Sequence, residues 1–84
     1  MADEPPFLQV LRLYAERSEV AAEVTLAMAA FDRATPEDAP RARLRLVGLQ
    51  LRFLEIALAL VLAEAALAAA EAEAAAADEA SAED

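Results

Sequence analysis

The side chains that could carry chemistry in this sequence are almost all carboxylates. Glu64, Glu71 and Glu73 lie within one short stretch, and paired acids can act in acid–base catalysis or hold two metal ions. A di-iron helical bundle also needs a histidine three residues after a glutamate, and the chain contains no histidine. These acids are therefore interpreted as exposed helix charges, and neither a metal nor a cofactor is expected.

The remaining reactive groups lack an activating neighbour. The sequence contains no Cys, His or Lys, so the usual thiol nucleophiles, imidazole bases and Schiff-base amines are missing. The side-chain hydroxyls are those of Tyr14, Ser18, Thr25, Thr35 and Ser81. No catalytic residue and no small-molecule substrate is predicted, and the protein is expected not to be an enzyme.

Charge is distributed unevenly along the chain. Residues 1–52 carry all seven arginines and eight acids, whereas residues 53–84 carry eight acids and no base. The first part therefore has a net charge of -1 and the second of -8, for a total of -9. This acidic balance argues against nucleic acid as a partner and against docking on anionic lipid.

The arginines and acids of the second half of the chain are related by a reflection about Ala57. Arg41 and Arg43 precede Ala57 by the same intervals at which Glu73 and Glu71 follow it. An antiparallel pairing of two copies would set each arginine opposite a glutamate of the other copy. The sequence therefore predicts inter-chain ion pairs among these four residues, with a parallel ring of hairpins as the competing arrangement.

Prolines divide the sequence into two helical stretches rich in Ala, Leu, Glu and Arg, the best helix formers. The first is expected over about 6–33. Thr35 and Pro36 have the features of a helix start, but Pro40 would remove a backbone hydrogen bond if that helix began there, so Asp38 is the alternative cap. The second helix is accordingly expected over about 38–80, with an acidic tail at 78–84 that frays.

The resulting fold is an all-α helical hairpin, a single domain over 1–84, assembled into a multi-chain bundle or ring. A rival interpretation takes 42–53 as strand, because Leu and charged residues alternate there. The helical interpretation is preferred because Leu is a weak strand former. The expected shared core is as follows: Phe7, Val10, Tyr14, Val24, Met28, Phe31, Leu51, Leu54, Leu58 and Leu62.

The helix lengths indicate an overhang. At 1.5 Å per residue the first helix spans about 40 Å and the second about 60–65 Å. Folding back at the proline-rich turn should bring Phe7 near Val61 and leave Leu62 onward without cover from the same chain. Of 84 residues, 60% are hydrophobic, which is more than one short chain hides comfortably. The overhang is therefore expected to pack on another copy.

The expected interface surrounds the most apolar turns of the second helix. Its members are Leu54, Ala57, Leu58, Leu60, Val61, Leu62 and Leu67. No membrane partner is expected, because Glu55 and Glu64 leave only a short uncharged run between them. The acidic start does not look like a secretory signal, so the chain is expected to be soluble, and cytoplasmic if expressed in a cell.

The pattern resembles a de novo designed helical homo-oligomer. The resemblance rests on the TPED helix start, on stretches such as LAEAALAAAEAEAAAA and on local helix propensity that agrees with the apolar pattern throughout. It implies self-assembly as the only activity. Arg and Ala richness without Lys also suits a natural protein from a GC-rich bacterial genome. In that case, the chain would be a small adaptor or regulator that packs its apolar face on a helix of another protein.

Overall fold

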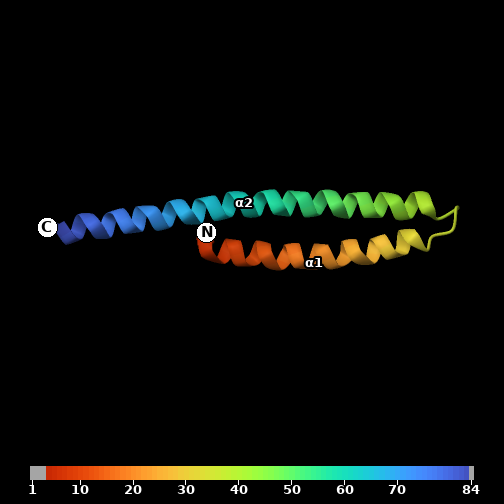
Figure 1. Ribbon diagram of the computed structural model, residues 1–84, viewed down its shortest axis with the longest axis horizontal. Coiled ribbons are helices and arrows are strands. Elements are labelled where there is room, and N and C mark those ends of the chain that lie inside the picture. Colours follow the sequence, from red (N-terminus) through yellow and green to blue (C-terminus); the bar gives the residue numbers. More distant parts are fainter. Residues whose placement is uncertain (1–3, 84) are drawn as a thin grey trace.

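The computed structural model describes residues 4–83 as two antiparallel helices, α1 (Pro6–Asp32) and α2 (Ala39–Glu83). They lie side by side in an elongated hairpin whose principal extents are 73 × 24 × 14 Å (Figure 1). The predicted all-α hairpin is confirmed. The strand interpretation of 42–53 is wrong, because α2 runs through that segment without a break.

The prolines at both helix starts occupy positions where a missing N–H costs nothing. Pro6 is the first residue of α1, and the carbonyl of Pro5 accepts a 3.0 Å hydrogen bond from the Gln9 N–H. Pro40 is the second residue of α2. At the end of α1, the Arg33 N–H donates to the carbonyl of Ala29 at 3.2 Å. Both observed helices lie within three residues of the expected boundaries.

The turn is held by Thr35 and Asp38. The Thr35 hydroxyl accepts a 3.3 Å hydrogen bond from the Asp38 N–H and donates a 3.2 Å bond to the Asp38 carboxylate. The Asp38 carbonyl in turn accepts from the Ala42 N–H at 3.0 Å, which is the first backbone bond of α2. Thr35 therefore supplies the side-chain bond to a backbone N–H that is typical of a helix cap, and Asp38 is the residue that precedes α2.

The core is a single row of side chains between the two helices. The buried cluster consists of Val10, Leu13, Val20, Ile56, Leu60 and Ala63, and half-buried Val24, Phe53, Ala59 and Leu67 pack against it. Only Val10 and Val24 of the predicted shared core belong to this cluster. Phe31 is half-buried, and the other predicted core residues are exposed on the single chain. One chain therefore covers only part of its apolar surface.

The overhang is shorter than expected. Ala63 is buried and Leu67 half-buried, so α1 still covers α2 at positions where the sequence predicts no cover. The expectation that cover ends before Leu62 is wrong. The turn lies where the sequence places it, but α1 is set further along α2 than a simple reflection at the turn predicts, because Tyr14 contacts Glu64. Every residue from Ala68 to Ser81 is exposed, and this part of α2 extends past the start of α1 (Figure 1). Helical structure continues through Glu83; fraying of 78–83 stays a prediction, and Asp84 lies outside the described residues.

Candidate interaction surface

α2 carries a second apolar face that α1 does not cover. Six large side chains on this face are 42–74% exposed and follow one another at alternating intervals of three and four residues. We call them the outer stripe, and they are Leu44, Val47, Leu51, Leu54, Leu58 and Val61. The same spacing continues into the overhang as Ala65, Ala68, Ala72 and Ala75. Such a 3-4 repeat is the pattern of a helix seam that packs against another helix.

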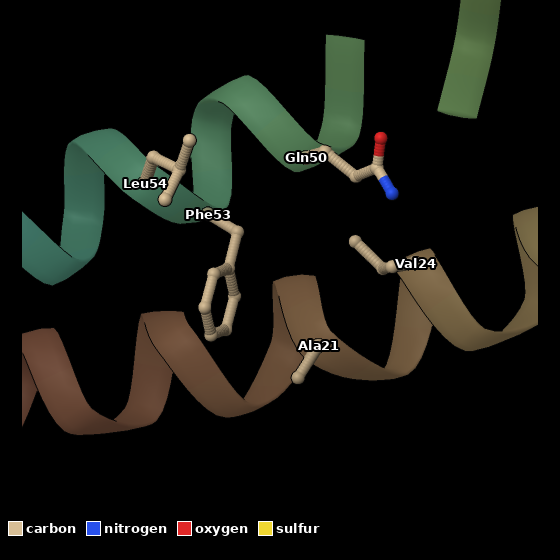
Figure 2. Close-up of a pocket in the computed structure, with 5 residues that line it drawn as sticks. All are labelled: Ala21, Val24, Gln50, Phe53 and Leu54. Carbon is tan, nitrogen blue, oxygen red and sulfur yellow. The ribbon is translucent and has the colours of Figure 1, made fainter. Parts of the chain in front are cut away.

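Sequence neighbours on α2 belong to different faces. Figure 2 shows Phe53 pointing toward α1 while Leu54 points away from it. The exposures of Leu58 and Leu60 differ in the same way, at 62% and 3% respectively. Each face has its own set of large side chains: one set packs against α1, and the other is exposed.

Polar side chains separate the two faces. On one flank of the outer stripe, Arg43, Gln50, Ala57, Glu64 and Glu71 follow one another at seven-residue intervals. We call this the Arg43 flank. Gln50 on this flank also borders an open apolar groove between the helices, lined by Ala21, Val24, Phe53 and Leu54 (Figure 2).

The opposite flank of the outer stripe contains Arg41, Gly48, Glu55 and Leu62, again seven residues apart. We call this the Gly48 flank. Arg45 and Arg52 lie beside it, one helical turn before and after Gly48. The outer stripe is therefore a bounded seam rather than part of a uniformly apolar helix.

The predicted interface residues fall into three groups. Leu54, Leu58 and Val61 belong to the outer stripe, and Leu62 is exposed beside it. Ala57 is half-buried on the Arg43 flank. The side chains of two others face α1 instead: Leu60 is buried in the chain's own core and Leu67 packs against that core. The helical period explains this, because both continue the line of Phe53, Ile56 and Ala63.

The interface expected from the sequence omits Leu44 and Val47, and it places Leu51 only in the shared core. The signal that identifies them is the unbroken 3-4 spacing from Leu44 to Val61. An equally regular row of apolar residues on the same helix faces α1. Periodicity alone cannot decide which line a partner helix would cover.

The four residues predicted to form inter-chain ion pairs are all exposed, namely Arg41, Arg43, Glu71 and Glu73. Among the side chains of residues 4–81, the ion pairs join Arg12 to Glu4 at 3.1 Å and to Glu16 at 2.9 Å. Arg43 and Glu71 are far apart on one continuous helix, at about 42 Å for 1.5 Å per residue. They cannot meet within a chain, so any contact between them requires a second copy.

A polar contact joins the two helices near the open end of the hairpin. The Tyr14 hydroxyl donates a 2.6 Å hydrogen bond to the Glu64 carboxylate, and this bond raises the pKa of Tyr14 above its ordinary value. The guanidinium of Arg17 lies 4.8 Å from the centre of the Tyr14 ring. No nucleophile is created by this arrangement, because the hydrogen bond holds the hydroxyl in its protonated form.

Two further classes of site are a metal site and a membrane-spanning helix. Among residues 4–81, whose side chains the structure describes, no three His, Cys, Asp or Glu side chains come together in a way that could hold a metal ion. α2 is long and apolar enough, by length and composition alone, to cross a membrane, and only 17% of its most apolar 18-residue window is buried. The outer stripe makes up much of this apolar character, so the same side chains could face lipid or protein.

The candidate surface on α2 is therefore an exposed helix seam, with charged residues on both flanks, on a hairpin with an uncovered extension. Comparison with protein-family models, curated proteins and solved structures finds no match to this chain.

Proposed function

We propose that this chain is a structural, self-assembling protein that forms a homo-oligomer through the outer stripe of α2. The observation that carries the proposal is the row of six large, exposed apolar side chains at helix-seam spacing, opposite the face that α1 covers. Full burial of such a side chain contributes about 1.5–3 kcal/mol. Six of them supply a driving force that a single chain leaves unused.

A second copy is a better occupant than an unrelated helix because α2 is complementary to itself. Its first part is basic and its extension is acidic, so two copies in opposite orientations bring unlike charges together. The sequence style supports the further proposal that the chain is a designed homo-oligomer. On this account it has no catalytic or ligand-binding activity.

A membrane is the competing occupant suggested by the length and composition of α2. Glu55 and Glu64 lie about 13 Å apart along the helix, so a bilayer about 30 Å thick would enclose both. A charged side chain at the bilayer centre costs about 2.5–3.5 kcal/mol on insertion scales. Self-association leaves both carboxylates in water and is therefore preferred.

The test compares two exposed leucines that differ in position. Leu58→Gln changes the outer stripe, whereas Leu26→Gln changes a 70% exposed residue on α1 and serves as the matched control. Light scattering should give an assembly for the unmodified chain and for Leu26→Gln, and a shift toward 8.9 kDa for Leu58→Gln. Circular dichroism should show that both variants remain helical.

Equal masses for the two variants would contradict the placement of the interface. A folded, unmodified chain that stays at 8.9 kDa would instead favour an adaptor that binds a helix of another protein. Transfer of the unmodified chain into neutral lipid vesicles, with loss of the soluble assembly, would favour the membrane.

A further inference from the structure

We propose that two copies pair their outer stripes in antiparallel orientation, with Leu54 and Leu58 of each copy packed on Leu58 and Leu54 of the other at the centre. This inference rests on the proposed function and specifies the partner and the register. In an antiparallel helix pair, the first apolar position of each heptad faces the second of the partner. That rule places Leu51 opposite the partner's Val61 and restricts sliding to whole heptads.

The apolar layers in this register are graded in size. Large side chains meet at the centre, through the pairs that Leu51 and Leu54 make with the partner's Val61 and Leu58. Toward the ends, Leu44 and Val47 meet the partner's Ala68 and Ala65, which begin the overhang. The uncovered extension of one copy thereby covers the base of the other hairpin, and each large side chain faces either another large side chain or an alanine.

The charges beside the seam are complementary in the same register. On the Arg43 flank, Arg43 lies opposite the partner's Glu71, and Gln50 faces the partner's Glu64 as a neutral hydrogen-bonding group. On the Gly48 flank, Arg41 and the partner's Glu73 lie at nearly the same height along the dimer. Glu73 lies beside this flank, one helix position further from the outer stripe. Exposed ion pairs contribute little affinity individually, but unfavourable charge contacts exclude competing orientations. The charges therefore act mainly to select this register.

The Gly48 flank supplies an independent observation. A Cβ atom at Gly48 would meet nothing within 4 Å inside the chain, so the hairpin itself does not require glycine there. Glycine within a helix costs about 1 kcal/mol relative to alanine. The proposed register places the partner's Leu62 opposite Gly48. Leu62 is 63% exposed and lies beside the outer stripe, so the missing side chain at Gly48 makes room for it.

Like charges meet at one place in this register. Glu55 approaches the partner's Glu55 across the two-fold axis, which by itself is unfavourable. Arg52 lies one helical turn before Glu55 on each copy, so two guanidinium groups flank the two carboxylates. The four charges sum to zero at the surface of the dimer.

A parallel, in-register pair lacks these relationships. Each residue of the Arg43 flank would face the Gly48-flank position five residues later on the partner, so Arg43 would lie beside Gly48 and Ala57 beside Leu62. No arginine of either flank would then face a glutamate. The basic starts of the two copies of α2 would lie side by side, as would their acidic extensions, and this nearness of like charges disfavours the parallel arrangement.

Cysteine cross-linking tests the register, since the chain has no cysteine of its own. Leu51→Cys and Val61→Cys are each oxidised alone and then as a mixture, with Leu26→Cys as the control for random collisions. Only the mixture of Leu51→Cys and Val61→Cys should form a disulfide dimer well above the control. A disulfide formed by Leu51→Cys alone would establish a parallel pair and overturn the proposal.

Charge reversal provides a second test of the register that needs no cysteine. Arg43→Glu and Glu71→Arg should each weaken dimerisation roughly tenfold, because each creates two like-charge contacts per dimer. The two changes combined in one chain should restore it. Since these residues cannot meet within a chain, recovery requires contact between copies; failure of the double variant to recover would overturn the register.

The outcomes separate this inference from the proposed function. An unmodified chain that is a folded monomer contradicts self-assembly itself. The chain could instead be a discrete dimer in which the mixture of Leu51→Cys and Val61→Cys forms no disulfide and the double charge reversal does not restore dimerisation. That result would support self-assembly and overturn only the antiparallel register. An assembly of more than two subunits with the same negative results would point to the ring of hairpins and would overturn the register as well.

Discussion

The hydroxyl group of Tyr14 and the carboxylate of Glu64 form a 2.6 Å hydrogen bond between residues that are 50 positions apart in the sequence. It lies near the open end of the hairpin, where the row of buried side chains is about to end at Ala63 and Leu67. Sliding α1 along α2 by one turn would break the bond. The contact therefore marks where the covered part of α2 gives way to the overhang.

Removal of this hydroxyl should loosen the open end without dissociating the assembly. Tyr14→Phe deletes the donor but keeps the ring, so we expect only a small fall in melting temperature, because an exposed hydrogen bond exchanges readily with water. Thermal melts followed by circular dichroism measure the change, and light scattering should give an unchanged mass. A loss of assembly in Tyr14→Phe would show that this edge belongs to the interface.

The pH dependence of this contact follows from the raised pKa of Tyr14. The Glu64 carboxylate accepts the hydrogen bond and opposes a second negative charge, so the Tyr14 pKa should exceed its ordinary value of about 10. A raised pKa in the folded state means that the stabilisation is complete below the unfolded pKa and is lost as pH rises through the folded one.

The chain has one tyrosine and no tryptophan, so ultraviolet absorbance of tyrosinate reports this group alone. We expect the midpoint to fall in denaturant, and also in Glu64→Gln, which keeps an acceptor but removes the charge. Identical midpoints in the native and denatured chain would contradict the hydrogen bond.

The two faces of α2 should respond differently to the same truncation. Leu60 is 3% exposed in the core between the helices, so Leu60→Ala should cost about 2–5 kcal/mol of hairpin stability. Leu58 is 62% exposed on the single chain, so Leu58→Ala should mainly lower the mass of the assembly. Urea unfolding over a range of protein concentrations separates these effects. A large, concentration-independent loss in Leu58→Ala would show that Leu58 belongs to the hairpin core instead.

Gly48→Ala should affect the hairpin and the dimer in opposite directions. The new methyl group has open space around it within the chain, so alanine should stabilise α2 by about 1 kcal/mol. In the antiparallel register the same methyl group displaces the partner's Leu62, and dimerisation should weaken. Urea unfolding of the dilute chain and light scattering at higher concentration measure the two effects. A dimer that becomes tighter would argue against close approach at this position.

Much of the fold could be predicted from local sequence. Thr35 and Asp38 mark the turn through hydrogen bonds to each other, and Ala-rich helices follow from intrinsic propensity. The choice of face on α2 could not be predicted in this way. Leu58 and Leu60 lie on equally regular apolar lines, and only packing against α1 decides which line becomes the core.

The extent of the overhang could not be predicted from the sequence pattern either. The turn lies where the sequence places it, between Asp32 and Ala39, but the offset of the two helices across that turn is set by packing between them. The sequence pattern therefore places Phe7 beside a position of α2 that is too close to the turn. It also assigns Leu67 to an interface with another chain, although Leu67 packs against the core of its own chain. The complementary positions of Arg43 and Glu71 predict a contact between two copies, and the structure of a single hairpin does not test that contact.

The mass of the unmodified chain in solution, measured by sedimentation over a dilution series, tests the central claim most directly. Self-assembly through the outer stripe predicts a discrete multiple of 8.9 kDa at high concentration, with a reversible shift toward 8.9 kDa on dilution. A helical, cooperatively melting chain that sediments at 8.9 kDa at every concentration would contradict it.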